Sequence, residues 1–186
     1  KSDNLIGLFI IGRKYKDESF KSYDFDFLNT LGTLAALAIN NAQLYEMATI
    51  DGITKLLVHR HLQYMLDLEI LRVSRYKGKL SLMMLDIDDF KKINDNYGHP
   101  AGDYVLRTIG KIIKNTIRGT DIGARYGGEE FAVIFPETDE EAGYLVSERM
   151  RKIIQNTEMI FEDKKFNITV SAGIAEFITD TKFQKK

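Results

Sequence analysis

Short apolar runs of strand length, separated by stretches with helical periodicity, constrain the fold of this 186-residue chain most strongly. Residues 80–85 form one run, and residues 122–126 and 131–135 form two more, joined by the turn sequence GGEE. Apolar residues that recur every three or four positions predict helices between the strands. These helices are 62–76, 103–116 and 140–155, and a last strand pattern covers 166–177. We predict an α+β fold whose helix-flanked sheet contains an antiparallel hairpin.

The first part of the chain has a different pattern. Residues 5–11 are apolar and predict a buried strand, while residues 23–49 contain no proline and carry an apolar seam at helical spacing. The seam residues are Leu28, Leu31, Ala35, Ala38, Ala42 and Tyr45. Two interpretations of this helix stay open: packing on its own domain, or parallel pairing in a dimer. We expect 1–48 to be separate from a domain at 49–186, and the chain to be part of a longer protein because Lys1 is not an initiator methionine.

The charges of the chain nearly cancel, which argues against nucleic acid or a membrane as a partner. The 26 Lys and Arg residues against 27 Asp and Glu residues give a net charge of −1, so no long-range attraction to an anionic polymer or bilayer is expected. No apolar run approaches the roughly 20 residues that span a bilayer. The absence of cysteine excludes disulfides and thiolate chemistry and suits a reducing compartment. We expect a cytoplasmic protein.

Three carboxylates stand beside the predicted strands: Asp86 directly after residues 80–85, and Glu129 and Glu130 in the hairpin turn. Acidic residues are ordinary at strand ends and turns, and each one alone is explained that way. If the hairpin lies beside residues 80–85, however, the three converge at one sheet edge and form an oxygen-rich site for Mg²⁺ and phosphate oxygens. Two such ions serve nucleotidyl transfer. Gly127 and Gly128 would let a ligand approach the backbone.

Several segments together resemble the GGDEF-domain diguanylate cyclases. The sequence RYGGEEF at 125–131 resembles the family signature in its GGEEF form, and DIDDFKKIND at 86–95 resembles the DxDxFKxxND segment. YGHPAGD at 97–103, SAG at 171–173 and DGIT at 51–54 resemble three further family segments in the expected order. The resemblance implies a sheet similar to that of adenylate cyclases and polymerase palms, flanked by helices and preceded by a signalling helix.

The resemblance also implies a GTP site with two Mg²⁺ or Mn²⁺ ions. Asp86, the Ile87 carbonyl and the two signature glutamates would hold the ions, and either Glu129 or Glu130 would deprotonate the 3′-hydroxyl. Nucleotide contacts would come from Gly127 and Gly128 in the turn and from Ile53, Phe90, Lys91, Asn94, His99 and Asp103. Phe90 and Lys91 would contact phosphates, Asn94 and Asp103 would recognise guanine, and Ile53 would pack under the base.

Simpler interpretations of these residues stay open. Ile53 is equally suited to core packing, and Lys91 to a solvated position at a helix start. Asp103 is suited to the N-cap of the helix that follows it, and His99 to a structural place in its loop.

A second anion site is implied by Arg118 and Asp121, which match the RxxD inhibitory motif upstream of the signature. In the family this site binds the product, cyclic di-GMP, and Arg149 on the next helix resembles an auxiliary ligand. Arginine suits this purpose because its fork of donors matches a phosphate. The alternatives are a surface ion pair for Arg118 and a solvated helical side chain for Arg149.

The chain departs from the family pattern in places. Lys55, Val58 and His59 replace the usual Gly, Asn and Arg of the opening segment. The family continues after the SxG strand into a helix with basic residues that reach the triphosphate, and we expect this chain to stop before that helix. Residues 1–48 resemble the last strand and closing helix of a GAF sensor domain.

The function predicted from these segments is that of a homodimeric diguanylate cyclase, which condenses two GTP molecules into cyclic di-GMP and two pyrophosphates. The alternative is a non-catalytic receptor for cyclic di-GMP or a relay module. The intact acids Asp86, Glu129 and Glu130 favour catalysis, because a receptor does not need them.

Overall fold

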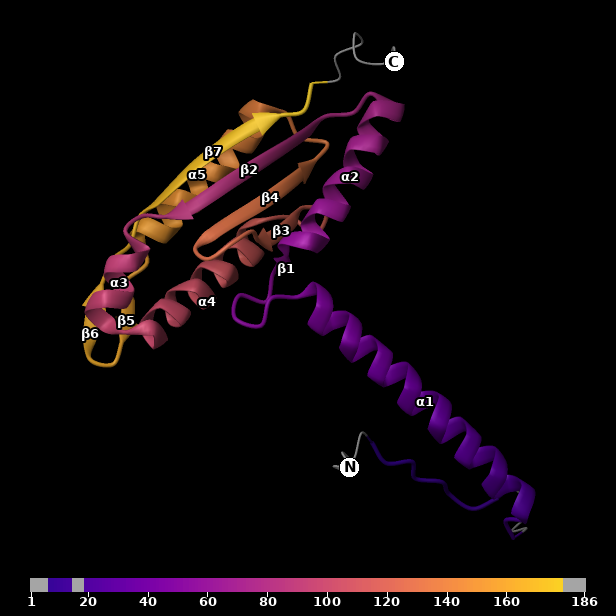
Figure 1. Ribbon diagram of the computed structural model, residues 1–186. Helices are drawn as coiled ribbons and strands as arrows, with labels where there is room; N and C mark the ends of the chain where they lie inside the picture. Colours follow the sequence, from indigo (N-terminus) through magenta and orange to yellow (C-terminus); the bar gives the residue numbers. More distant parts are fainter. Residues whose placement is uncertain (1–6, 15–18, 179–186) are drawn as a thin grey trace. The chain divides into compact units, whose positions relative to one another are not determined.

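The computed structural model describes residues 7–14 and 19–178, and the chain divides into two compact units, Lys1–Ala48 and Thr49–Lys186. Figure 1 shows the helices and strands of each unit. The GAF-like origin of the first unit stays a prediction.

Helix α1, Ser22–Thr49, makes up most of the first unit. The carboxylate of Asp24 lies in its first turn, accepts a hydrogen bond from the Lys21 N–H at 2.7 Å and pairs with the Lys14 ammonium at 2.6 Å. The predicted helix is confirmed. Large apolar side chains of α1 are exposed, among them Leu31 at 41% and Leu34 at 58%.

The strand predicted at residues 5–11 is wrong for the part that the structure describes. Residues 7–12 form no strand, and Leu8 and Ile10 are 78% and 87% exposed. Residues 5 and 6 lie outside the described residues. A strand needs a neighbour for its N–H and C=O groups, and residues 7–12 pair with no described strand.

A five-stranded sheet forms the centre of the second unit, in the order β1-β3-β4-β2-β7. The strands are β1 (Leu57–Val58), β2 (Leu80–Ile87), β3 (Ile122–Arg125), β4 (Glu130–Pro136) and β7 (Val170–Glu176). Strand β1 is parallel to β3, and the other neighbours are antiparallel. β2 lies between β4 and β7, and both sheet faces along it carry apolar side chains. This position explains why its sequence is a continuous apolar run.

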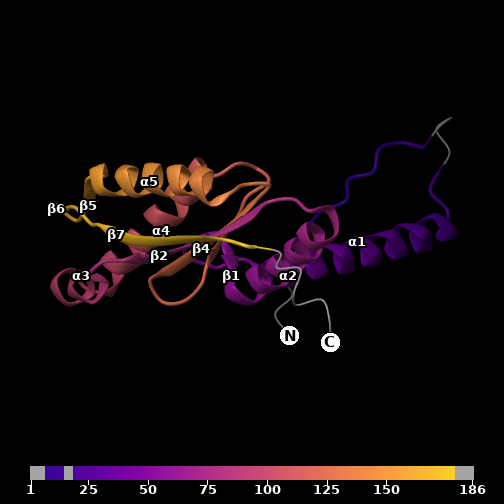
Figure 2. The same ribbon diagram turned by 90° about the horizontal axis from the view of Figure 1, so that it is seen from above.

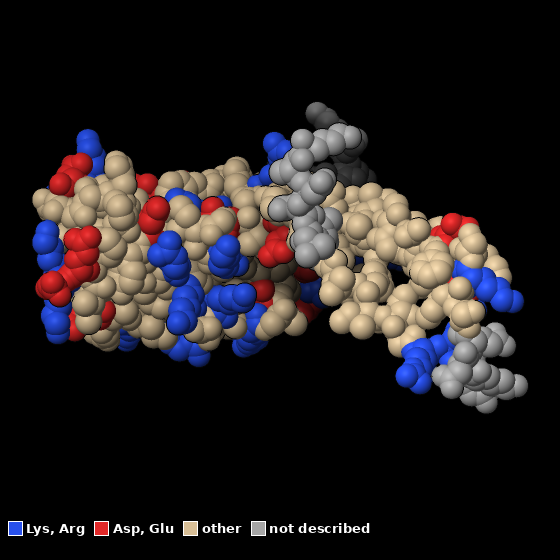
Figure 3. Space-filling model, turned by 90° about the horizontal axis from the view of Figure 1, so that it is seen from below, with Lys and Arg blue, Asp and Glu red and all other residues tan. Residues whose placement is uncertain are grey.

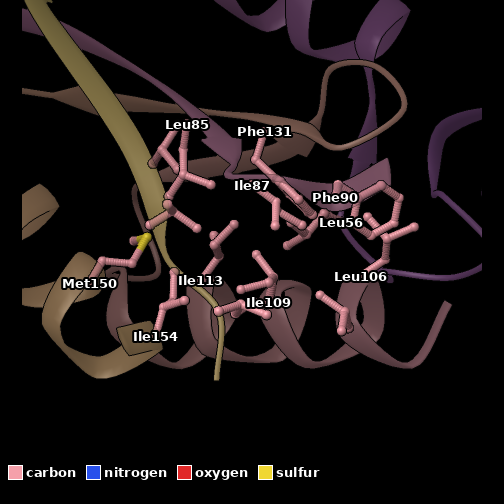
Figure 4. Packing of buried hydrophobic residues seen from close by; sticks show 14 of the residues in the cluster. Leu56, Leu85, Ile87, Phe90, Leu106, Ile109, Ile113, Phe131, Met150 and Ile154 are labelled. Carbon is pink, nitrogen blue, oxygen red and sulfur yellow. The ribbon is translucent and has the colours of Figure 1, made fainter. Parts of the chain in front are cut away.

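Helices cover both faces of this sheet (Figure 2). Helices α4 (His99–Thr116) and α5 (Glu140–Asn156) pack on one face and α2 (His59–Tyr76) on the other. Figure 4 shows the larger core, in which side chains of β2 and β4 meet those of α4 and α5. Leu85 and Phe131 from the sheet and Ile109 from α4 are at most 2% exposed. Burial of each such side chain contributes about 1.5–3 kcal/mol.

Four elements were not predicted: the short strand β1, helix α3 (Phe90–Tyr97), and the two strands of a hairpin, β5 (Met159–Phe161) and β6 (Lys164–Phe166). The ring of Tyr97 stacks on that of Phe166, with centroids 4.6 Å apart, and so joins α3 to the hairpin. Phe90 and Ile93 are buried at a spacing of three residues, and Tyr97 follows four residues later, which is a short helical pattern that ends at Gly98.

Several predicted boundaries need correction. Helix α2 begins at His59 and not at residue 62, and α4 begins at His99 with proline in its first turn, a position that proline favours. Asp103 therefore lies inside α4, and its interpretation as an N-cap is wrong. The strand predicted at 166–177 corresponds to β7, which begins only at Val170, while Phe166 is the last residue of β6.

Candidate active site

Two acidic residues face each other across neighbouring strands. In the antiparallel register of β2 and β4, Asp86 is the partner of Glu130 and Leu85 is the partner of Phe131. The hairpin of β3 and β4 thus lies beside β2, and the predicted meeting of Asp86 with a signature glutamate is confirmed. On its other side Asp86 is the partner of Ser171 in β7.

Negative charge is concentrated at this edge of the sheet. The pKa of Asp86 is raised above its usual value by partial desolvation and, next, by the charges of Glu129, Glu130 and Asp88. Beside Asp86 lies a pocket of about 190 Å³, lined by Met84, Leu85, Asp86, Glu130, Ser171, Ala172 and Gly173. Acids that repel one another in an open pocket suit a bound cation.

The donor set determines which kind of cation site fits. The described residues contain no group of three or more Asp, Glu or His side chains able to surround one ion. Asp86 and one signature glutamate supply two carboxylates, and the Ile87 carbonyl oxygen lies one residue further along the chain. Mg²⁺ is commonly bound through one or two carboxylates together with substrate phosphates. The site therefore fits a divalent ion that binds with a nucleotide.

Arg125 holds the signature turn in place. Its Nε and Nη2 atoms donate hydrogen bonds to the Gly128 carbonyl at 3.0 and 2.8 Å, and its Nη1 atom lies 3.2 Å from Asp51 Oδ2. Although partial burial alone would raise the pKa of Asp51, the N–H and hydroxyl of Thr54 and the charge of Arg125 keep that pKa below its usual value. This link could not be predicted from the sequence, because Asp51 and Arg125 are far apart along the chain.

The two glycines of the turn have different surroundings. A Cβ added to Gly127 would lie 2.8 Å from Glu130 Oε2, whereas one added to Gly128 would meet nothing within 4 Å. Gly127 thus leaves room for the carboxylate of Glu130. The backbone approach predicted for a ligand stays a prediction for Gly128, where the space is open.

The turn between β2 and α3 offers unpaired amide groups. Asp89 there has a φ of +56°, and α3 begins at Phe90 without a side-chain cap. The first N–H groups of a helix attract anions, which suits the phosphate contacts predicted at Phe90 and Lys91. The ring of Phe90 is buried in the main core, and the side chain of Lys91 is exposed.

Asn94 lies close to Asp103 because its side chain packs on Gly102, the residue before Asp103. A Cβ added to Gly102 would overlap Asn94 Oδ1, so glycine allows the Asn94 side chain to lie against α4. Asp103 follows Gly102 and is exposed. An amide and a carboxylate are the groups predicted to recognise guanine. Ile53 packs against the main core, and His99 is exposed at the start of α4.

Arg118, Asp121 and Arg149 form a second group. Asp121 Oδ2 accepts a hydrogen bond from the Arg118 backbone N–H at 2.8 Å, and Arg149 Nη2 donates to the Thr116 carbonyl at 3.0 Å. Among the described residues, Asp121 Oδ1 is buried without a hydrogen-bond partner, and no ion pair joins the side chains of Arg118 and Asp121.

Basic side chains gather among acidic ones on the face that Figure 3 shows. Helix α4, which leads to Arg118, exposes Arg107, Lys111 and Lys114. Positive charge that leads to the RxxD residues suits an anionic ligand.

The family model described as "Diguanylate cyclase, GGDEF domain" matches residues 48–185. The chain belongs to the GGDEF family. Diguanylate cyclase A of Treponema denticola is 40% identical over 98% of this chain and 50% of that protein, and diguanylate cyclase DgcP of Pseudomonas aeruginosa is 42% identical over 71% of this chain and 20% of that protein. The chain thus spans half or less of the length of these curated relatives.

Solved structures of GGDEF domains share the fold. The coiled coil and GGDEF domain of DgcB from Caulobacter crescentus, solved with c-di-GMP, superposes with a TM-score of 0.80 at 28% identity and covers 85% of this chain and 84% of that one. The active GGEEF domain of a diguanylate cyclase from Vibrio cholerae has a TM-score of 0.56 at 30% identity, and the match covers 60% of this chain and 70% of that one. These likenesses confirm the predicted fold class.

Two residues that differ from the usual GGDEF pattern, Lys55 and His59, have visible structural surroundings. Lys55 has a φ of +58°, a conformation that the usual glycine adopts freely and lysine does not. His59 replaces an arginine, and its ring lies on that of Tyr126 in the signature, with centroids 4.1 Å apart. No described helix of this GGDEF protein is long and apolar enough to cross a membrane.

Proposed function

We propose that this chain is catalytic and condenses two GTP molecules into cyclic di-GMP with release of two pyrophosphates. The observation that carries the proposal is the pairing of Asp86 with Glu130 in an open acidic pocket, with Glu129 close enough to raise the pKa of Asp86. The names of the relatives, which are diguanylate cyclases, support the same reaction.

We call Asp86, Ile87, Glu129 and Glu130 the acidic edge, and each of these residues has a proposed role. Asp86, the Ile87 carbonyl and the signature glutamates would hold divalent cations, which lower the charge on the triphosphate when bound and favour departure of pyrophosphate. Glu129 or Glu130 accepts the proton of the attacking 3′-hydroxyl. That oxygen forms a bond to the α-phosphorus of the second GTP, and the bond from phosphorus to the pyrophosphate oxygen breaks.

The remaining residues bind and orient the nucleotide. The N–H groups at the start of α3 and the Lys91 ammonium bind phosphates. The Asn94 amide and the Asp103 carboxylate pair with guanine, and an adenine leaves these groups unmatched. Asp103→Ser should therefore reduce the preference for GTP over ATP.

Ring closure requires two copies of the domain, because the signature supplies one GTP site per chain and each 3′-hydroxyl must meet the other nucleotide. The exposed apolar seam of α1 is our proposed site of parallel pairing. Product is proposed to bind at Arg118, Asp121 and Arg149, where Asp121 Oδ1 has no hydrogen-bond partner among the described residues and can accept a hydrogen bond. This second group is the observation that favours the alternative function, a receptor.

The deciding experiment incubates the chain with GTP and Mg²⁺ and measures cyclic di-GMP and pyrophosphate. Asp86→Asn and Glu129→Gln should each reduce turnover at least about a hundredfold, while Asp163→Asn, an exposed acid between β5 and β6, serves as the matched control. Wild-type turnover in both acidic-edge variants would contradict the proposal. Tight binding of cyclic di-GMP by a wild-type chain that releases no pyrophosphate would favour the receptor.

A further inference from the structure

Asp88, two residues after Asp86, has a different set of contacts. Its Oδ2 accepts a hydrogen bond from Thr169 Oγ1 at 2.5 Å, and its Oδ1 accepts one from Ser171 Oγ at 2.7 Å. Its backbone N–H donates to the Thr169 carbonyl at 3.0 Å. Three hydrogen bonds therefore join the turn after β2 to the segment that enters β7.

These contacts occupy both oxygens of the Asp88 carboxylate. Asp86, in contrast, accepts no side-chain hydrogen bond among the described residues and lines the acidic pocket. A negative charge close to Asp86 and Glu130 is unfavourable unless donors stabilise it, and the two hydroxyl groups are such donors. The two aspartates thus differ in purpose: Asp86 faces the pocket, and Asp88 faces β7.

The turn that Asp88 secures contains the groups proposed to bind the nucleotide. Ile87 precedes Asp88, and Asp89, with its φ of +56°, leads into the uncapped start of α3 at Phe90. A non-glycine residue keeps such a conformation only where its surroundings hold it. The direction of the Ile87 carbonyl and of the first N–H groups of α3 depends on this turn.

We propose that Asp88 is a positioning residue, which together with Thr169 and Ser171 holds the β2–α3 turn in the shape that presents the Ile87 carbonyl to the cations and the α3 amides to the phosphates of GTP. The inference rests on the proposed function for its ligand. It also assigns a purpose to Ser171, the serine of the SAG segment, and to Thr169.

Three variants separate positioning from direct cation binding. Asp88→Ala removes the acceptor, and Thr169→Val combined with Ser171→Ala removes both donors but keeps the Asp88 charge. Asp88→Asn keeps one acceptor oxygen and gains an N–H₂ group that can donate to a hydroxyl. Positioning predicts that the first two behave alike and that asparagine restores much of the loss. Direct cation binding predicts that asparagine is as harmful as alanine and that the double variant resembles wild type.

The first measurement is amide hydrogen exchange of the nucleotide-free 186-residue chain, read in peptides that cover residues 87–93. Exchange there should be about tenfold faster in Asp88→Ala and in the double variant. A tenfold change corresponds to the free energy of about one lost charge-assisted hydrogen bond. Thr157→Val, which loses a hydroxyl bond to the Ile153 carbonyl at the end of α5, is the matched control and should leave these peptides unchanged. Unchanged exchange in the double variant would overturn the inference, even if Asp88→Ala fails to fold.

The second measurement separates positioning from a general loss of stability. Under conditions where every variant is folded, the double variant should raise KM for GTP about tenfold, whereas a smaller folded fraction would lower kcat and leave KM unchanged. An unchanged KM in the double variant would count against the inference. The exchange experiment needs no turnover, so an inactive wild type would refute the proposed function and still leave the positioning of the turn to be decided.

Discussion

Replacing Arg125 with alanine should destabilise the GGDEF domain, because this side chain joins the signature turn to the segment that opens the domain. The guanidinium donates two hydrogen bonds to the Gly128 carbonyl and pairs with Asp51 at 3.2 Å. The side chains of Arg125 and Asp51 are each 19% exposed. Both charges are therefore largely removed from water.

The expected loss lies between two limits. An exposed ion pair contributes about 0–1 kcal/mol, and removal of one partner from a fully buried pair costs about 3–5 kcal/mol. For a pair that is mostly buried and also loses two bonds to a carbonyl, we expect about 2 kcal/mol. A domain of this size loses roughly 3–4 °C of Tm for each kcal/mol, so Tm should fall by about 7 °C.

Thermal unfolding at pH 7, followed by circular dichroism and calorimetry, measures this change. Arg125→Lys keeps the charge but not the planar fork of donors and should recover about half of the loss. Arg107→Ala, an exposed arginine on α4, is the matched control. A fall in Tm for Arg125→Ala no larger than that of the control would refute the reasoning.

The same link predicts a pH dependence. Because the pKa of Asp51 is lower in the folded chain than its ordinary 3.8, its contribution is present above that value and is lost as the pH falls through the folded pKa. The urea midpoints of wild type and Asp51→Asn should therefore converge below about pH 4. A gap between the midpoints that stays constant down to pH 3 would contradict this assignment.

Three further changes have expected outcomes. Gly102→Ala should displace the Asn94 side chain and raise KM for GTP about tenfold with a smaller change in kcat, and an unaltered KM would argue against the guanine contact. Arg118→Ala should weaken cyclic di-GMP binding about tenfold in calorimetry without lowering the initial rate; equal affinities would return this arginine to an ordinary surface position. Leu31→Asp combined with Ala38→Asp should shift sedimentation toward monomer and make specific activity fall on dilution, and an unchanged dimer would exclude the α1 seam as the contact.

The sequence was sufficient for the elements whose patterns are local. The apolar run of β2, the hairpin of β3 and β4 and the long helices follow from side-chain periodicity, and the meeting of Asp86 with Glu130 follows once the hairpin is placed beside β2. In each case the residues that decide the structure are close together in the chain or lie on one continuous strand.

Contacts between distant segments could not be predicted in the same way. The bonds of Arg125 to Asp51 and of Asp88 to Thr169 and Ser171 depend on which strands become neighbours. Asp103 is an example of a misleading local signal. Its residue type and position predicted an N-cap, but α4 begins about one turn earlier, with proline in its first turn. The described part of the strand predicted at residues 5–11 is not a strand, because residues 7–11 pair with no described strand.

The place of β2 in the sheet has a consequence for synthesis of the protein. Its partners, β4 at Glu130–Pro136 and β7 at Val170–Glu176, follow it by roughly 50 and 90 residues, so β2 leaves the ribosome long before either partner exists. Until then both of its edges, and the apolar face that later packs on α4 and α5, are open to other chains, which is a hazard for aggregation. Such long-range pairing also slows folding. The acidic edge therefore becomes complete only when β4 has been made.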